Sequence, residues 1–111
     1  MGNPNRRLGR RLNVRFRQVG EEKSHVGYTI NISATGMFVA TIRPLKPGTQ
    51  VDVEVSDKEH TMRIDAVVVH ARKVPPVWQR IRPSGMGVRF LDPRDRAMAL
   101  RQMVGPAASL W

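Results

Sequence analysis

The chain has 111 residues, of which 41% are apolar and 25% are charged, and this composition fits one globular domain. It contains no cysteine, which excludes disulfides and thiolate metal sites, and no apolar run approaches the ~20 residues of a membrane span. We therefore expect a cytoplasmic protein without membrane insertion, whose net charge of +10 points to an anionic partner.

An arginine-rich segment opens the chain. It contains six arginines and no acidic residue in the first 17 positions, at Arg6, Arg7, Arg10, Arg11, Arg15 and Arg17. Arginine suits anionic partners because its guanidinium stays charged and offers a planar fork of donors. The first residues also hold glycine and proline with almost no apolar content, which predicts a flexible arm over residues 1–12. Residues 13–111 then form the globular domain.

Apolar and polar residues alternate through most of the chain after residue 12, which is typical of half-buried strands. Turn-forming segments rich in glycine, proline and serine separate the alternating runs. We expect strands near 13–19, 25–33, 36–42, 50–56, 60–73 and 85–91. Antiparallel strands of this length can close on themselves and remove their exposed edges. The predicted fold is an all-β, six-stranded antiparallel β-barrel.

The strand 25–33 ends in a segment with polar side chains. Alternation predicts an inward set made of Val26, Tyr28, Ile30 and Ile32. The opposite parity then places Thr29, Asn31 and Ser33 on the outer face. In the turn that follows, a serine side chain can organise the backbone. Gly36 can adopt a positive φ or let a ligand approach the backbone.

Two later segments complete the chain. The proline-rich connection before the last strand contains Trp78, which we interpret as packing within its own loop. Arg89 alternates with inward neighbours and is expected to point outward. After that strand, Asp92 is a typical N-cap, Pro93 fits the first turn, and Gly105 fits the end of a short C-terminal helix.

Catalytic signals are lacking in the sequence. It contains no paired-carboxylate motif, no histidine-positioned serine and no glycine-rich phosphate loop. The three histidines, which are His25, His60 and His70, show no metal-ligand spacing. We therefore expect a protein that is not an enzyme and that holds no metal.

Two motifs resemble those of the PilZ family of bacterial second-messenger receptors, which carry R-x-x-x-R followed, one strand later, by [DN]-x-S-x-x-G. Asn31, Ser33 and Gly36 meet the second motif. The first motif is met twice, by Arg6 with Arg10 and by Arg7 with Arg11. We prefer the second register because the next residue begins the first strand, as in the family, but the first register stays open. The segments at residues 36–39 and 85–92 also look like PilZ sequences.

The resemblance implies a six-stranded split barrel with a C-terminal helix that binds cyclic di-GMP, often as an intercalated dimer. The arginine arm would order around the nucleotide and signal to a protein partner that the sequence does not name. Asn31 and Ser33 would supply amide and hydroxyl groups, and Gly36 would leave room for the ligand. Asn31 replaces the family's more frequent aspartate, which leaves a hybrid cyclic GMP-AMP ligand open.

Two other functions remain alternatives at this point. One is a small basic barrel that binds RNA or DNA, although the concentration of charge in an arm makes nucleic acid the less favoured partner. The other is a PilZ-like adaptor that acts by protein contact and does not bind nucleotide.

Overall fold

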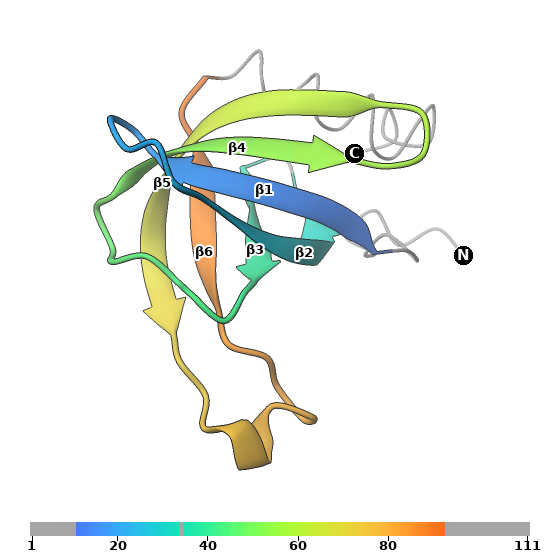
Figure 1. Cartoon of the computed structure of the whole chain (residues 1–111), viewed down its shortest axis with the longest axis vertical. Helices are drawn as coiled ribbons and strands as arrows, with labels where there is room; N and C mark the ends of the chain where they lie inside the picture. Colours follow the sequence, from blue (N-terminus) through green and yellow to red (C-terminus); the bar gives the residue numbers. More distant parts are fainter. Residues whose placement is uncertain (1–10, 34, 93–111) are drawn as a thin grey trace.

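The structure is a computed structural model that describes residues 11–33 and 35–92, apart from the side chains of Ile30 and Asn31. Its strands form one closed antiparallel barrel in the order β1-β2-β3-β6-β5-β4, with β4 pairing back onto β1 (Figure 1). The strands are β1 (Leu12–Gln18), β2 (Ser24–Ile32), β3 (Gly36–Ala40), β4 (Gln50–Ser56), β5 (Thr61–Arg72) and β6 (Gly85–Phe90). The predicted six-stranded barrel is thereby confirmed. The predicted C-terminal helix and residues 1–10 of the predicted arm lie outside the described residues.

The barrel interior is filled by the apolar side chains that alternate along the strands, because successive side chains of a strand point to opposite faces. In β1, for example, Leu12, Val14 and Phe16 are at most 2% exposed, while the residues between them face outward. β4 and the first half of β5 follow the same pattern. Burying each large apolar side chain contributes about 1.5–3 kcal/mol, so this interior is the main source of stability.

β2 departs from the predicted alternation. Val26, expected in the core, is 70% exposed, and Thr29, expected outside, is only 1% exposed. The pairing of β2 with β3 shifts between Tyr28 and Asn31, so an irregularity changes the parity of the strand at this point. Ile32 is buried as predicted, at 2% exposure. The inward assignment was therefore wrong for the first half of β2, because sequence alternation carries no mark of the bulge.

The connection between β5 and β6 projects away from the barrel (Figure 1) and contains one short 3-10 helix, η1 (Pro76–Trp78). Its base is held firmly. Arg72 donates from Nη2 to the carbonyl of Pro83 at 3.0 Å, and the Val74 amide donates to Ser84 Oγ at 2.8 Å. Its outer part is not packed: Trp78 is 56% exposed, so the expectation that this ring packs within its loop was wrong.

No helix in the described part of the chain is long and apolar enough to cross a membrane.

Candidate functional site

The turn between β2 and β3 is built around the side chain of Ser33. Its Oγ accepts hydrogen bonds from the amides of Thr35 and Gly36, each at 3.3 Å, and donates to the Gly36 carbonyl at 3.2 Å. The Ser33 amide also donates to the Gly36 carbonyl at 2.8 Å. The predicted role of serine in organising this turn is confirmed. The hydroxyl therefore mainly holds the turn together, and it has few hydrogen-bonding positions left for a ligand.

Gly36 is required by the barrel itself. The described glycines with positive φ are Gly20 and Gly48, so Gly36 does not use that freedom. A Cβ at Gly36 would instead collide with the backbone carbonyl oxygen of Val88 on β6. The Phe90 amide donates to the Thr35 carbonyl at 2.9 Å, which fastens the turn to β6. The sequence predicted a positive φ or the approach of a ligand at Gly36; the φ is not positive, and the close neighbour in the structure is the backbone of β6.

A groove of about 330 Å³ lies beside this turn, over the outer faces of β3, β5 and β6. Its titratable lining residues in the described part of the chain are His70 and Arg89, with no carboxylate. Arg89 is exposed, as predicted, and it pairs with Gly36 across the β3–β6 ladder. The lining residues are Ser33, Thr35, Gly36, Met37, Phe38, Val69, His70, Gly87, Val88 and Arg89. A groove with this charge favours an anionic ligand.

Aromatic rings form one wall of the groove. The rings of Phe38 and His70 lie 6.4 Å apart between centroids with 25° between their planes, and the Arg72 guanidinium lies 4.7 Å from the Phe38 centroid. These rings cover Gly85 and Gly87, where any Cβ would collide with them. Sequence reasoning missed this wall. The signal available was the pair of glycines in β6, because strand glycines are often covered by aromatic side chains.

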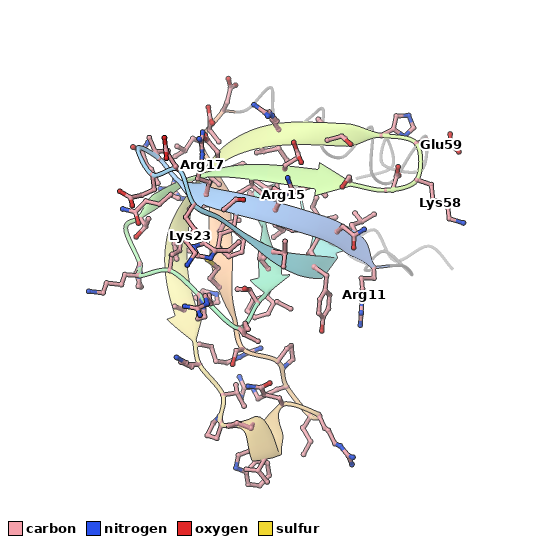
Figure 2. The ribbon with its side chains drawn as sticks, in the orientation of Figure 1. Arg11, Arg15, Arg17, Lys23, Lys58 and Glu59 are labelled. Carbon is pink, nitrogen blue, oxygen red and sulfur yellow. The ribbon has the colours of Figure 1, made fainter. Side chains whose placement is uncertain are left out.

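Arg11 is the one predicted ligand-binding arginine among the described residues. Its guanidinium carbon lies 3.9 Å from the centroid of the Tyr28 ring, a cation–π contact. Leu12 pairs with Thr29, so Arg11 lies at the end of β1 that borders the second half of β2. Figure 2 shows its side chain at that end of β1, away from Arg15 and Arg17. Tyr28, which sequence alternation placed in the core, is instead half-buried and positions Arg11.

The remaining predicted site residues are only partly placed. Arg6, Arg7 and Arg10 lie outside the described residues. Asn31 pairs through its backbone with Phe38, and its side chain is not described. The structure therefore joins Ser33 and Gly36 in one turn and places Arg11 beside Tyr28 on the strand that leads into it, and it does not decide between the two arginine registers.

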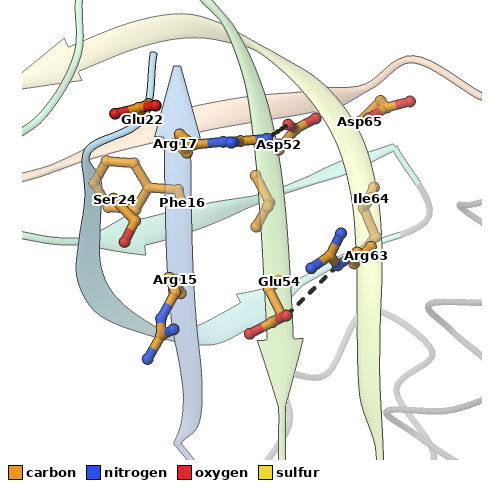
Figure 3. A pocket seen from close by; sticks show the side chains of 11 residues that line it. Arg15, Phe16, Arg17, Glu22, Ser24, Asp52, Glu54, Arg63, Ile64 and Asp65 are labelled. Carbon is orange, nitrogen blue, oxygen red and sulfur yellow. Dashed lines mark hydrogen bonds and ion pairs between the residues drawn. The ribbon is translucent and has the colours of Figure 1, made fainter. Parts of the chain in front are cut away.

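A second and larger groove, of about 450 Å³, lies over β1, β4 and β5 (Figure 3). Its lining holds three arginines but also four carboxylates, which are Glu22, Asp52, Glu54 and Asp65. Arg17 donates from Nη2 to Asp52 Oδ2 at 2.8 Å, and Arg63 lies 3.6 Å from Glu54. Two of the three arginines are thus paired with neighbouring carboxylates. Despite its size, this face is a poorer site for an anion than the groove beside Ser33.

The Arg17–Asp52 ion pair gives a pH-dependent contribution to stability. The hydrogen bond from Arg17 lowers the pKa of Asp52 from its ordinary value of 3.8. A depressed carboxyl pKa stabilises the fold above the unfolded-state pKa, and this contribution is lost as pH falls through the folded-state pKa. Both side chains are almost half exposed, so we expect Asp52→Asn to lower the free energy of unfolding by less than about 1 kcal/mol at neutral pH.

Urea unfolding of the wild type and Asp52→Asn at neutral pH and near pH 3 measures this effect, since pH 3 lies below the ordinary carboxyl pKa of 3.8. The difference between the two proteins should shrink at the acidic pH. Glu54→Gln is the matched control and should change stability less, because Arg63 is 86% exposed and 3.6 Å away. A difference for Asp52→Asn that grows on acidification would contradict the assignment.

The barrel is similar to those of solved PilZ proteins. It matches the crystal structure of the PilZ domain of CeSA from a cellulose-synthesizing bacterium with a TM-score of 0.65 and 16% identity, covering 90% of this chain and 96% of that one. It also matches the Bacillus subtilis inhibitor of motility, MotI/DgrA, with a TM-score of 0.61 and 22% identity, covering 88% of this chain. The match covers 47% of MotI/DgrA, so the likeness spans about half of that protein. No curated protein sequence matches the chain.

The sequence model of the PilZ domain matches residues 5–105. The chain belongs to the PilZ domain family. PilZ domains are receptor domains without catalytic activity, which agrees with the prediction that this protein is not an enzyme. Within the described residues of this PilZ domain, no group of three or more histidines or carboxylates could hold a metal ion.

Proposed function

We propose that this PilZ domain is a receptor for cyclic di-GMP that closes its N-terminal arginines over the nucleotide beside the Ser33 turn. The observation that carries the proposal is the groove beside the Ser33 turn, whose described lining contains His70 and Arg89 and no carboxylate. Arg11 lies on β1, which pairs with the strand that leads into this turn. The family supports it, because PilZ domains generally bind this nucleotide.

The chemistry of the ligand fits these groups. Cyclic di-GMP carries two phosphates and two guanines, and arginine binds both phosphate oxygens and the O6/N7 edge of guanine. Arg7 and Arg11 would supply two such forks in the preferred register, and Arg6 and Arg10 would supply them in the other. The amide of Asn31 can contact a guanine edge, and the basic groove with His70 and Arg89 attracts the phosphates.

Ordering of the arm is the proposed signal. Fixing the arm that the sequence predicts to be flexible would cost conformational entropy, so part of the contact energy would be spent on ordering it. The ordered arm and the nucleotide then form a new surface at this end of the barrel. A protein partner that contacts this surface would distinguish the bound state from the free state.

Titration of the full chain with cyclic di-GMP by isothermal calorimetry tests the proposal. We expect saturable binding that guanine-free cyclic di-AMP does not reproduce and that changes little with salt. Arbitrary RNA or DNA oligonucleotides are the comparison, because a nucleic-acid binder loses affinity steeply as salt displaces it from phosphates. Steeply salt-dependent uptake of any oligonucleotide, without preference for cyclic di-GMP, would favour the RNA- or DNA-binding alternative. Absence of binding to either would favour the adaptor.

A further inference from the structure

The outer part of the β5–β6 connection presents large apolar side chains to solvent. Val77 is 75% exposed, Trp78 is 56% exposed and Ile81 is 75% exposed. They occur within five consecutive residues, in and just after η1. We call residues 76–82 the tip. Exposed apolar side chains that are neighbours in the chain, with a tryptophan among them, indicate a contact surface, because exposed apolar patches often mark interaction sites.

The tip and its base carry basic residues and no acidic ones. Arg80 and Arg82 are part of it, and Lys73 stands at its base; all three are exposed. From Ala66 to Leu91 the sequence contains five arginines and lysines and no aspartate or glutamate. Beside the tip lies a hollow of about 400 Å³, lined by Arg72, Lys73, Val74, Pro75, Trp78, Ile81 and Arg82. The partner therefore combines apolar surface with negative charge.

The shape of the tip also limits the partner. Figure 1 shows the connection standing out from the end of the barrel, so the apolar side chains are carried on a projection. Its base is fixed, because Arg72 bonds the Pro83 carbonyl and Ser84 Oγ accepts from the Val74 amide. A projecting apolar tip can enter the headgroup region of a bilayer, where tryptophan is favoured, while its arginines remain among the phosphates.

We propose that the tip docks this protein on the surface of an anionic lipid bilayer. Val77, Trp78 and Ile81 enter the interface, and Lys73, Arg80 and Arg82 bind lipid phosphates, with the hollow accepting one headgroup. This contact lies in the plane of the interface and needs no spanning segment, so it is compatible with the lack of a membrane-spanning run in the sequence. Lipid is the favoured partner because an exposed tryptophan beside basic side chains matches a bilayer interface, where apolar surface and phosphate lie next to each other.

Co-sedimentation of the full chain with vesicles tests the proposal. We expect binding to vesicles of phosphatidylcholine and phosphatidylglycerol in a two-to-one ratio, and none to phosphatidylcholine alone. Trp78→Ser with Ile81→Ser should lower the partition coefficient at least tenfold. Arg80→Gln with Arg82→Gln should also lower it, since each basic residue near an anionic surface strengthens binding by about fivefold. The tip is exposed, so these variants should keep the wild-type melting temperature.

Matched controls separate the tip from the general positive charge of the chain. Val19→Ser with Val26→Ser removes two apolar side chains of 52% and 70% exposure elsewhere on the barrel. Lys23→Gln with Lys58→Gln removes two charges that Figure 2 places away from the tip. Both controls should bind vesicles like the wild type. Equal losses in the controls and the tip variants would overturn the proposal, and so would absence of binding to the anionic vesicles.

Fluorescence locates the contact directly. The chain has two tryptophans, so Trp111→Phe leaves Trp78 as the reporter. Its emission should shift to the blue with anionic vesicles and be quenched by brominated lipid. Vesicle binding without either change would mean that the arginine arm alone holds the lipid, which would overturn the role of the tip. Because no nucleotide is added, failure of this proposal leaves the proposed nucleotide function untouched.

Discussion

Replacing Arg7 and Arg11 together by alanine is expected to weaken cyclic di-GMP binding at least about 30-fold, since each bidentate arginine contact contributes about 1–3 kcal/mol. Arg11 is held against Tyr28 at 3.9 Å, so its guanidinium is partly ordered before the ligand binds. Isothermal calorimetry measures the loss. Arg11 is a cleaner target than Ser33, because the Ser33 hydroxyl also holds the turn through its bonds to Thr35 and Gly36.

The controls for this prediction use arginines of the same segment. Arg15→Ala should leave affinity unchanged, because Arg15 faces the groove over β1, β4 and β5 (Figure 3). Arg6→Ala with Arg10→Ala tests the alternative register. If that pair causes the greater loss, the register with Arg6 and Arg10 is correct. If neither pair changes affinity relative to Arg15→Ala, the arginine arm does not bind the nucleotide.

Replacing Gly36 by alanine is expected to destabilise the barrel by about 2 kcal/mol or more, as overpacking against unyielding neighbours does. The added Cβ meets the Val88 carbonyl oxygen, and backbone within a hydrogen-bonded ladder cannot move aside without breaking the β3–β6 pairing. A loss of this size lowers the melting temperature by roughly 10 °C, which calorimetry or circular dichroism measures. Nucleotide affinity should fall as well, because the turn and the groove share this strand pair.

Gly48→Ala provides the comparison for Gly36. Gly48 has a φ of 92° and no neighbouring atom within 4 Å of an added Cβ, so its substitution strains only the local backbone. That strain costs about 1–2 kcal/mol for an ordinary residue in a left-handed conformation. Gly48→Ala should therefore lower stability and leave nucleotide binding intact. A melting temperature of Gly36→Ala equal to that of the wild type would contradict the packing role of Gly36.

Family membership and barrel architecture were predictable from the sequence because both depend on local patterns. Alternation in Leu12, Val14 and Phe16 reports which face of a strand is buried, and turn residues mark where strands end. The R-x-x-x-R and [DN]-x-S-x-x-G motifs also stand in fixed relation to those strand boundaries. Each of these signals depends on a few neighbouring residues and not on tertiary contacts, so it can be recognised before the fold is known.

By itself, the sequence determined the six strands, the family and the organising role of Ser33. Tertiary structure decided which groups meet. The bulge in β2 turns Val26 outward and Thr29 inward, opposite to the alternation in the sequence. It also leaves the Tyr28 ring outside the core, where it contacts Arg11. The pairing of β3 with β6 explains why residue 36 is a glycine. Phe38 and His70 lie over the two glycines of β6 and so form the wall of the groove. These features depend on strand register and on backbone contacts between distant segments, which no local pattern in the chain records.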